Sequence, residues 1–214
     1  MSNLDNEINN LKQLTMKMGE LVIENLKVAL EIYYNYDKEK ADLINDDVVD
    51  LHERLIEEMC LNIMVKERPF ARDLREVSGI LKLVEDLERL GDHAEDIKEF
   101  ATKLEGIDHH QIEFLDESYK ESIKMVLDSI TSFVNYDLDL ANKVILNDSK
   151  VDKLYDDAIS YIIENTNNGK FSSAFSIYTT LVVKYIERIA DHAVNIAEWV
   201  IYILNGYHKD KQIF

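Results

Sequence analysis

The phrase ERLGDHAEDI at Glu88–Ile97 returns as ERIADHAVNI at Glu187–Ile196, 99 positions later, with six of its ten residues unchanged. Such a spacing divides the 214 residues into two similar units of about 100 residues each, an ordinary size for a domain. The repeated phrase therefore predicts an internal duplication.

Apolar residues around both copies follow the period of a helix packed in a bundle. From Ile80 to Leu104 they recur at alternating steps of three and four, and matching apolar residues between Val182 and Val200 lie 99 positions later. This pattern is typical of one buried helix face. The chain has one proline and six glycines, and so few helix breakers favour long helices over a β-rich fold.

Helical periodicity predicts six helices in two sets of three. Pro69 suits the first turn of the third helix, because its missing N–H would be unpaired there anyway, and Gly106 and Gly206 suit left-handed helix ends. The helices are expected at about residues 3–35, 38–68, 69–104, 111–136, 138–166 and 172–204. We therefore expect an all-α fold of two tandem antiparallel three-helix bundles related by internal duplication, with domains at 1–106 and 107–214.

The net charge of −18 argues against some classes of partner. Binding to nucleic acid depends largely on Lys and Arg, and anionic lipid heads attract basic segments, so cations or a basic protein surface fit better. Cys60 is the only cysteine, which allows no internal disulfide and favours a cytoplasmic location. The polar start of the chain and its short apolar runs predict neither a signal peptide nor direct membrane insertion.

The acids of the repeated phrase lie on a stripe away from the apolar helix face. Oxygen-bearing residues recur there at i, i+4 and i+8: Glu88, Asp92 and Asp96 in the first copy, and Glu187, Asp191 and Asn195 in the second. Acids one turn apart repel each other by a few tenths of a kcal/mol, but they can close on one hard cation. The stripe is therefore either a solvated charged face or a metal site.

A neighbouring helix should supply further oxygen ligands. The acids that the second and fifth helices offer are Asp46, Asp47, Asp50, Glu53 and Glu57, and Asp148, Asp152, Asp156 and Asp157. Because VDLHERL and VDKLYDD both open with Val-Asp, we choose Asp50 and Asp152 as the first candidates.

Two further residue pairs match across the copies. His93 and His192 lie at the border of the apolar face, where a histidine is more often packed and hydrogen-bonded than a ligand. Arg89 and Arg188 could bind a partner's carboxylate or phosphate. The alternative for them is a surface salt bridge worth less than about 1 kcal/mol.

Two stretches resemble the PhoU family, the accessory and regulatory proteins of phosphate transport. They are RPFARDLREVSGILKLVEDLERLGDHAEDI (Arg68–Ile97) and YIERIADHAVNIAEWVIYILNG (Tyr185–Gly206), and the resemblance covers nearly the whole chain. It implies two three-helix bundles with surface metal clusters at Glu-x-x-x-Asp motifs, which here match Glu88 with Asp92 and Glu187 with Asp191. It also implies dimers or larger oligomers.

The resemblance further implies a cytoplasmic role. Such a protein signals phosphate sufficiency between a phosphate ABC transporter and a sensor histidine kinase, and represses phosphate-starvation genes. The chain departs from the pattern in its second half, where Ala190 stands in place of Gly91 and Lys184 in place of Glu85. The second half also lacks the P-x-A-x-D-L-R run, so we expect tighter metal binding at the first bundle.

The sequence is consistent with three functions. We favour a non-enzymatic, metal-binding regulator, with iron, zinc, magnesium and manganese not distinguished. A helical adaptor would use the acidic stripe to dock a basic partner without metal. A di-metal carboxylate enzyme would place its acids inside the bundle, usually in Glu-x-x-His pairs, and neither Glu88 nor Glu187 has a histidine three residues later.

Overall fold

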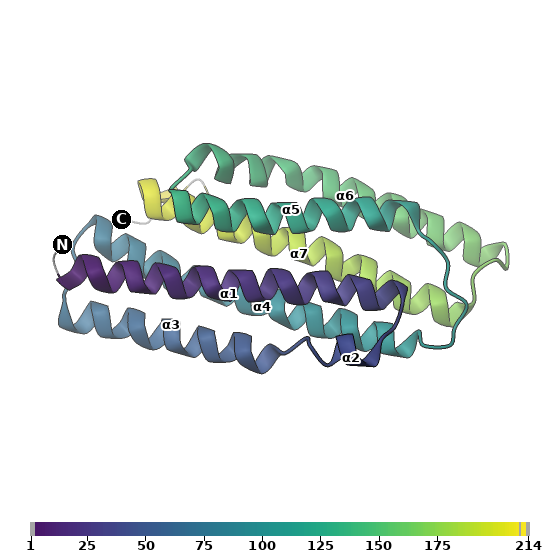
Figure 1. Ribbon diagram of the computed structural model, residues 1–214. Coiled ribbons are helices and arrows are strands. Elements are labelled where there is room, and N and C mark those ends of the chain that lie inside the picture. Colours follow the sequence, from purple (N-terminus) through teal and green to yellow (C-terminus); the bar gives the residue numbers. More distant parts are fainter. Residues whose placement is uncertain (1–2, 210, 213–214) are drawn as a thin grey trace.

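The computed structural model describes residues 3–209 and 211–212, and these residues form seven helices and one short antiparallel hairpin. In chain order the elements are α1 (Asn3–Tyr34), α2 (Lys38–Ala41), α3 (Asp46–Lys66), α4 (Arg72–Lys103), α5 (Glu113–Asn135), α6 (Leu138–Asn167), α7 (Ser173–Asn205), β1 (Tyr207–His208) and β2 (Lys211–Gln212). In Figure 1, α1, α3 and α4 form one group and α5, α6 and α7 the other.

The last long helix of each group lies at the centre of the molecule. Helix α4 packs against α1 and α3, α7 packs against α5 and α6, and α4 and α7 also pack against each other. The connection between the groups contains Gly106, whose φ of 77° is left-handed. The predicted all-α fold of tandem three-helix bundles is therefore confirmed.

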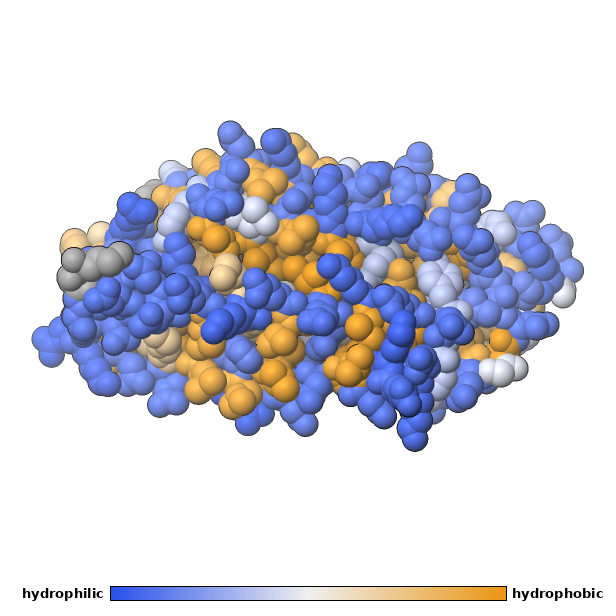
Figure 2. Space-filling view, in the orientation of Figure 1, coloured by the Kyte–Doolittle hydropathy of each residue, from blue (hydrophilic) through white to orange (hydrophobic). Residues whose placement is uncertain are grey.

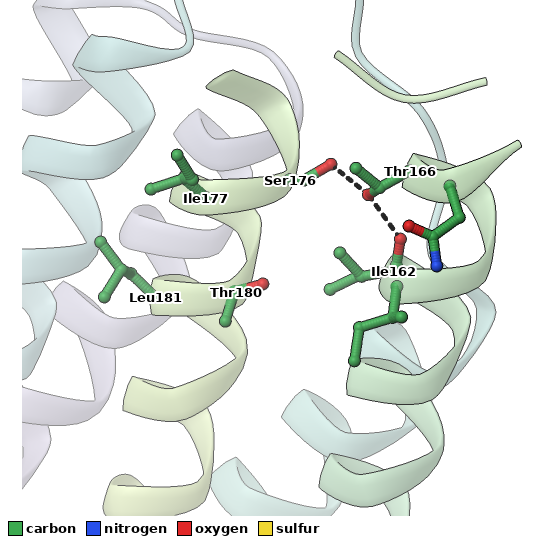
Figure 3. Close-up of a pocket in the computed structure, with 8 residues that line it drawn as sticks. Ile162, Thr166, Ser176, Ile177, Thr180 and Leu181 are labelled. Carbon is green, nitrogen blue, oxygen red and sulfur yellow. Dashed lines mark hydrogen bonds between the residues drawn. The ribbon is translucent and has the colours of Figure 1, made fainter. Parts of the chain in front are cut away.

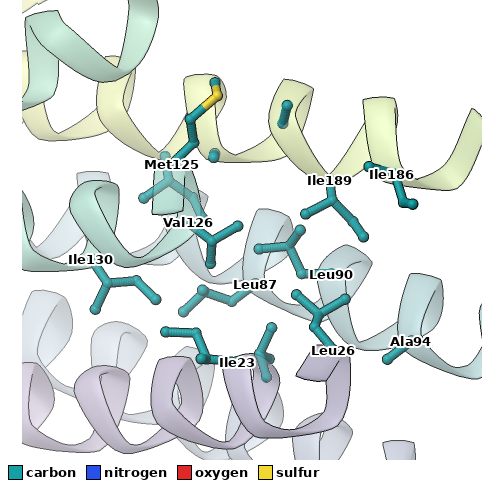
Figure 4. Close-up of a cluster of buried hydrophobic side chains, with 14 of the residues drawn as sticks. Ile23, Leu26, Leu87, Leu90, Ala94, Met125, Val126, Ile130, Ile186 and Ile189 are labelled. Atoms are coloured by element: carbon teal, nitrogen blue, oxygen red, sulfur yellow. The ribbon is translucent and has the colours of Figure 1, made fainter. Parts of the chain in front are cut away.

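The two bundles share one continuous core. In Figure 4, Leu87 and Leu90 of α4 lie among side chains of α1, α5 and α7. The seam predicted for both central helices is buried, with Ile80 and Ile97 of α4 and Val182 and Ile196 of α7 all at 0% exposure. Burial of this continuous apolar surface supplies the main driving force for folding.

Close packing of α4 on α7 depends on Gly79. A Cβ atom at this position would lie 2.3 Å from Cγ1 of Ile203, far inside the normal contact distance. With any larger residue at this position, the two helices could not approach as closely as they do.

Within the part of the chain that the structure describes, no helix is both long and apolar enough to cross a membrane.

Two predicted helix boundaries were wrong. The second predicted helix is divided into α2 and α3, because the N–H groups of Leu43 and Ile44 bond to carbonyls only three residues back and the backbone of Asn45 is extended. Helix α4 begins at Arg72, which leaves Pro69 in a loop rather than in a first turn.

The α3–α4 loop departs from helical geometry. Arg68 and Ala71, on either side of Pro69 and Phe70, have φ values of 48° and 49°. These positive φ values lie outside the right-handed helix, so α4 cannot include either residue. A proline in a loop is equally free of the need for an N–H partner.

Candidate metal centres

Five carboxylates of the first bundle meet in the seam between α3 and α4. We call this set, Asp46, Asp50, Glu53, Glu88 and Asp92, the first acidic cluster. One carboxylate oxygen each from Asp50, Glu53 and Glu88 lies within 4.8 Å of the other two. The side chains are half-buried rather than spread over an open surface, because α4 turns this part of its acidic stripe toward α3.

The electrostatics of the first acidic cluster show an excess of negative charge. Burial, and then the charges of Asp92, Asp50 and Glu88, raise the pKa of Asp46 to about 6. Burial also raises the pKa of Glu53 and of Glu88. The Oδ1 atom of Asp46 is buried and has no hydrogen-bond partner among the described residues. A buried acceptor without a partner destabilises the folded state unless a cation or a proton binds to it.

Gly91 lets α3 come close to the first acidic cluster. A Cβ at this position would lie 2.9 Å from Oδ1 of Asp46 and 3.0 Å from Cγ1 of Val49. Both contacts are tighter than van der Waals packing allows. The glycine therefore sets how near Asp46 can lie to the carboxylates of α4.

Arg89 neutralises part of the first acidic cluster. Its Nη1 donates to Oδ2 of Asp92 at 2.7 Å, and its Nε lies 3.4 Å from Oε2 of Glu88. Most of the arginine side chain is exposed, so solvent screens these two contacts. Its partner-binding role stays a prediction.

The second bundle holds four carboxylates in the equivalent seam between α6 and α7. This second acidic cluster consists of Asp148, Asp152, Glu187 and Asp191. Burial, and then the charges of Asp152, Asp191 and Glu187, raise the pKa of Asp148 to about 6. Burial likewise raises the pKa of Glu187 and of Asp191. The Oε2 atom of Glu187 is buried without a hydrogen-bond partner in the described part of the chain.

The second acidic cluster has a weaker negative field than the first. Tyr155 occupies the place that Glu53 has in the first bundle, in the register that aligns Asp50 with Asp152. The ammonium of Lys184 lies 3.7 Å from Oε2 of Glu187 and 5.7 Å from the Tyr155 ring centre. The second cluster thus has one carboxylate fewer, whereas both clusters have a cation beside them, Lys184 here and Arg89 at the first.

The structure places Asp96 and Asn195 away from both acidic clusters. Asn195 donates through Nδ2 to Oδ1 of Asp86 at 3.1 Å, and Asp96 lies beside Tyr185, whose hydroxyl lowers its pKa against the larger effect of burial. These contacts place both residues between α4 and α7. The acidic stripe faces that side here because positions at i+8 are rotated relative to position i around the helix axis. Their role as ligands stays a prediction.

The paired histidines also pack between α4 and α7. His93 is buried, its pKa is lowered to about 3 chiefly by burial, and its ring centre lies 5.2 Å from that of His192. His192 places Nδ1 2.9 Å from Oδ1 of Asp86. Arg188 lies over the ring of Tyr185 at 5.6 Å, so the structure gives it an aromatic neighbour in its own chain.

Three residues of the clusters were not chosen from the sequence. Asp46, Glu53 and Asp148 stood among the acids that the neighbouring helices offer, but only Asp50 and Asp152 were selected. A signal was present, because Asp46 and Asp148 each lie four residues before the selected aspartate. That spacing places them one turn away on the same helix face.

An apolar cavity of about 380 Å³ lies between α6 and α7, apart from the carboxylates. Figure 3 shows Ile162, Ile177 and Leu181 around it, with Thr166 hydrogen-bonded to Ser176. Its lining residues carry no titratable side chain, so it has no direct part in binding a cation.

The fold and these clusters define a class: an all-α protein of two fused three-helix bundles, each with carboxylates gathered between two of its helices. The PhoU domain model matches the chain twice, at residues 15–101 and 115–200. The chain belongs to the PhoU family of phosphate-specific transport system accessory proteins.

Relatives from several bacteria match most of the chain. The PhoU homolog of Aquifex aeolicus is 38% identical over 210 residues, which cover 94% of this chain and 92% of the relative. PhoU of Escherichia coli is 31% identical over 208 residues, with 94% and 84% covered. Family membership confirms the prediction that the protein is a regulator and not an enzyme.

Solved structures agree with the fold. The phosphate transport system regulatory protein PhoU from Streptococcus pneumoniae has a TM-score of 0.90 at 28% identity, with 98% of this chain and 100% of that chain covered. PhoU from Pseudomonas aeruginosa also has a TM-score of 0.90, at 30% identity, with 96% and 100% covered. The tandem-bundle architecture is thus the one found in these relatives.

Proposed function

We propose that this protein is a cytoplasmic regulator of phosphate uptake and phosphate-starvation signalling that binds metal ions at its two acidic clusters. One observation carries the metal part of the proposal. Carboxylate oxygens of Asp50, Glu53 and Glu88 converge within 4.8 Å, in a seam where burial already disfavours the negative charge of Glu53 and Glu88. A bound cation would offset both the burial and the mutual repulsion.

The proposed ligands are the members of the two acidic clusters. Oxygen-only ligand sets suit hard cations such as magnesium, manganese or iron, and zinc also accepts carboxylates, so the choice among them is left to measurement. The larger ligand set of the first acidic cluster supports tighter binding there than in the second.

The proposed partners are a phosphate ABC transporter and a sensor histidine kinase. The relatives are named as accessory proteins of the phosphate-specific transport system, which supports a role at that transporter. The protein would report phosphate sufficiency from transporter to kinase and so repress phosphate-starvation genes. We also propose that it associates with itself as a homodimer or a larger oligomer.

A metal-independent acidic adaptor is the second candidate. Arg89 already pairs with both Glu88 and Asp92, which shows that part of the acidic stripe can be neutralised within the chain. In this case a basic partner surface would replace the cation at the clusters.

Metal analysis of protein purified without chelator separates the two candidates. The metal-binding proposal expects bound metal that falls sharply in a variant carrying Glu88→Ala and Asp92→Ala. Glu85→Ala is the matched control, because Glu85 is an exposed acid of the same helix already paired with Lys82 at 2.6 Å. Protein that contains no metal, and that binds each of Mn²⁺, Mg²⁺, Zn²⁺ and Fe²⁺ no better than the double variant, would favour the adaptor.

The partner proposal is tested with the purified transporter and kinase. Each is used to capture the protein with and without phosphate and with and without chelator. Phosphate-dependent capture supports the regulatory proposal, and loss of capture with chelator ties it to the metal. No capture by either partner under any condition would contradict it.

A further inference from the structure

The first bundle exposes an apolar surface on α1 and α3 that its core does not use. We call this surface the α1–α3 outer face; it consists of half-buried Leu21 of α1, Leu43 in the turn before α3, and Val48, Leu51 and Leu55 of α3. Val48, Leu51 and Leu55 are 37%, 53% and 45% exposed, and a shallow cavity of about 250 Å³ lies beside Val48. Figure 2 shows apolar side chains gathered where Figure 1 places α3.

The second bundle lacks this apolar surface. In the register that aligns Asp50 with Asp152, the positions equivalent to the three apolar residues of α3 are charged: Lys150, Lys153 and Asp157. The same architecture therefore needs no apolar residues there for folding. Apolar side chains that the fold does not require mark an interaction surface when they lie together.

The charges beside this face are complementary to themselves. Asp47 and Arg54 are seven residues apart on α3, and Leu51 lies between them. Positions seven apart lie on the same side of a helix. If two copies of α3 pack antiparallel about Leu51, each Arg54 comes within one residue, about 1.5 Å along the helix axis, of Asp47 of the other copy.

The apolar residues of α3 also match one another in this antiparallel arrangement. The same antiparallel arrangement sets Leu51 against Leu51 and brings Leu55 close to Val48 of the second copy, since 48 and 55 are also seven apart. A twofold contact requires this kind of self-complementary patch. Arg54 is free to take part, because its side chain is 72% exposed and its contact with Asp50 is a single one at 3.2 Å.

A second copy of this chain is the occupant that such a self-complementary face suits. A lipid surface fits less well, because the chain carries a charge of −18.

We propose that a second copy of this chain covers the α1–α3 outer face, with α3 antiparallel to its counterpart about Leu51. The proposal rests on the part of the proposed function in which the protein associates with itself, and it adds the interface. The metal ligands of α3 lie on its other side, toward α4. Metal binding and dimer formation can therefore fail independently.

The first test is the mass of the protein in solution, measured by sedimentation or light scattering. Wild type is expected to be a dimer, and Leu51→Glu is expected to raise its dissociation constant at least tenfold. Leu127→Glu is the matched control, because Leu127 of α5 is 50% exposed and should leave the dimer intact. A monomeric wild type would overturn both self-association and this interface, whereas a dimer that Leu51→Glu leaves unchanged would overturn the interface alone.

The second test fixes the geometry. Leu51→Cys introduces an exposed thiol at the proposed twofold axis, and a short bifunctional thiol reagent should link two copies, since Cys60 is fully buried and does not compete. Leu127→Cys should give no linked dimer. Equal linking of both variants would overturn the proposal.

The third test uses the charges. Asp47→Arg and Arg54→Asp should each weaken the dimer severalfold, and the double variant should restore it because the reciprocal pairs are rebuilt. A double variant weaker than either single one would show that these residues do not meet. If the wild type is instead a monomer that binds the purified transporter through this face, the transporter and not a second copy is the occupant of the face.

Discussion

The two acidic clusters share one plan but differ in their surroundings. Each joins two aspartates of a middle helix, one turn apart, to the Glu-x-x-x-Asp motif of the following central helix. The first cluster includes Glu53 and lies against Gly91. In the second, Tyr155 and Ala190 occupy those two places, and Lys184 lies beside the carboxylates. The comparison shows that the repeated apolar seam preserves the pairing of the helices while the charge around the shared carboxylates changes.

The largest effect is expected from removing the motif of one bundle at a time. A variant with Glu88→Ala and Asp92→Ala should lose the tighter phase of metal binding, with affinity at that cluster falling about a hundredfold or more, because changing even a residue that only supports a ligand costs 10–100-fold. Glu187→Ala with Asp191→Ala should remove only the weaker phase. Titration calorimetry on metal-free protein measures both, and equal metal occupancy in wild type and the first variant would contradict the ranking of the two clusters.

Converting the second cluster into a copy of the first should narrow the difference. Tyr155→Glu with Lys184→Glu adds two carboxylates and removes a cation near the ligands. We expect metal affinity there to rise about thirtyfold, or roughly 2 kcal/mol, as charges of this kind act at close range. Lys153→Glu serves as the control for added charge on an exposed side of α6. An unchanged affinity in the double variant would mean that helix spacing, and not charge, separates the two clusters.

Helix spacing is tested at Gly91. Gly91→Ala adds a Cβ 2.9 Å from Oδ1 of Asp46, so α3 or the carboxylate must move, and crowding of this kind costs about 1–3 kcal/mol. We expect metal affinity at the first acidic cluster to fall about tenfold. Ala190→Gly in the second bundle should leave its cluster unaffected, because that helix pair already accommodates a Cβ. Equal losses in both variants would point to a general effect on α4 and α7.

The fold was largely predictable because its two central helices carry their packing pattern in the sequence. Alternating steps of three and four placed Leu87 and Ile189 in the core, and the repeat gave the number of bundles. The break between α2 and α3 was missed because residues 42–45 contain neither proline nor glycine, and the turn that they form is visible only in three dimensions. The connection of both bundles into one core also depends on how α4 meets α7.

The candidate site was predictable along one helix but less so between helices. Glu88 and Asp92 follow from i, i+4 spacing on α4, and the structure brings Glu88 beside Asp50 and Asp92 beside Asp46. The convergence of Glu53 with them depends on the relative rotation of α3 and α4, which a single sequence does not specify. The same rotation explains why Asp96 turns away from the cluster.

A smaller effect is expected at Asp46, whose pKa is raised to about 6. A raised carboxyl pKa contributes stability below the unfolded value, near 3.9, and that contribution is lost as the pH rises through about 6. In metal-free protein, Asp46→Asn should therefore be more stable than wild type by about 1 kcal/mol at pH 7, with solvent screening reducing the full effect of the shift. At pH 4 the two should be alike. Denaturant unfolding at both pH values checks this, and a variant less stable than wild type at pH 7 would contradict it.

The smallest effect is expected where the acidic stripe leaves the cluster. Asp96→Asn should change metal affinity at the first bundle by less than about threefold, a difference of roughly 0.7 kcal/mol, because its carboxylate lies beside Tyr185 rather than beside the carboxylates of α3. Asp92→Asn, one turn earlier on the same helix, is the matched comparison and should cost far more. A loss of tenfold or more from Asp96→Asn would instead make the ligand set follow the full i, i+4, i+8 stripe. The site would then extend along α4 toward α7, and the two bundles would share their metal region as they share their core.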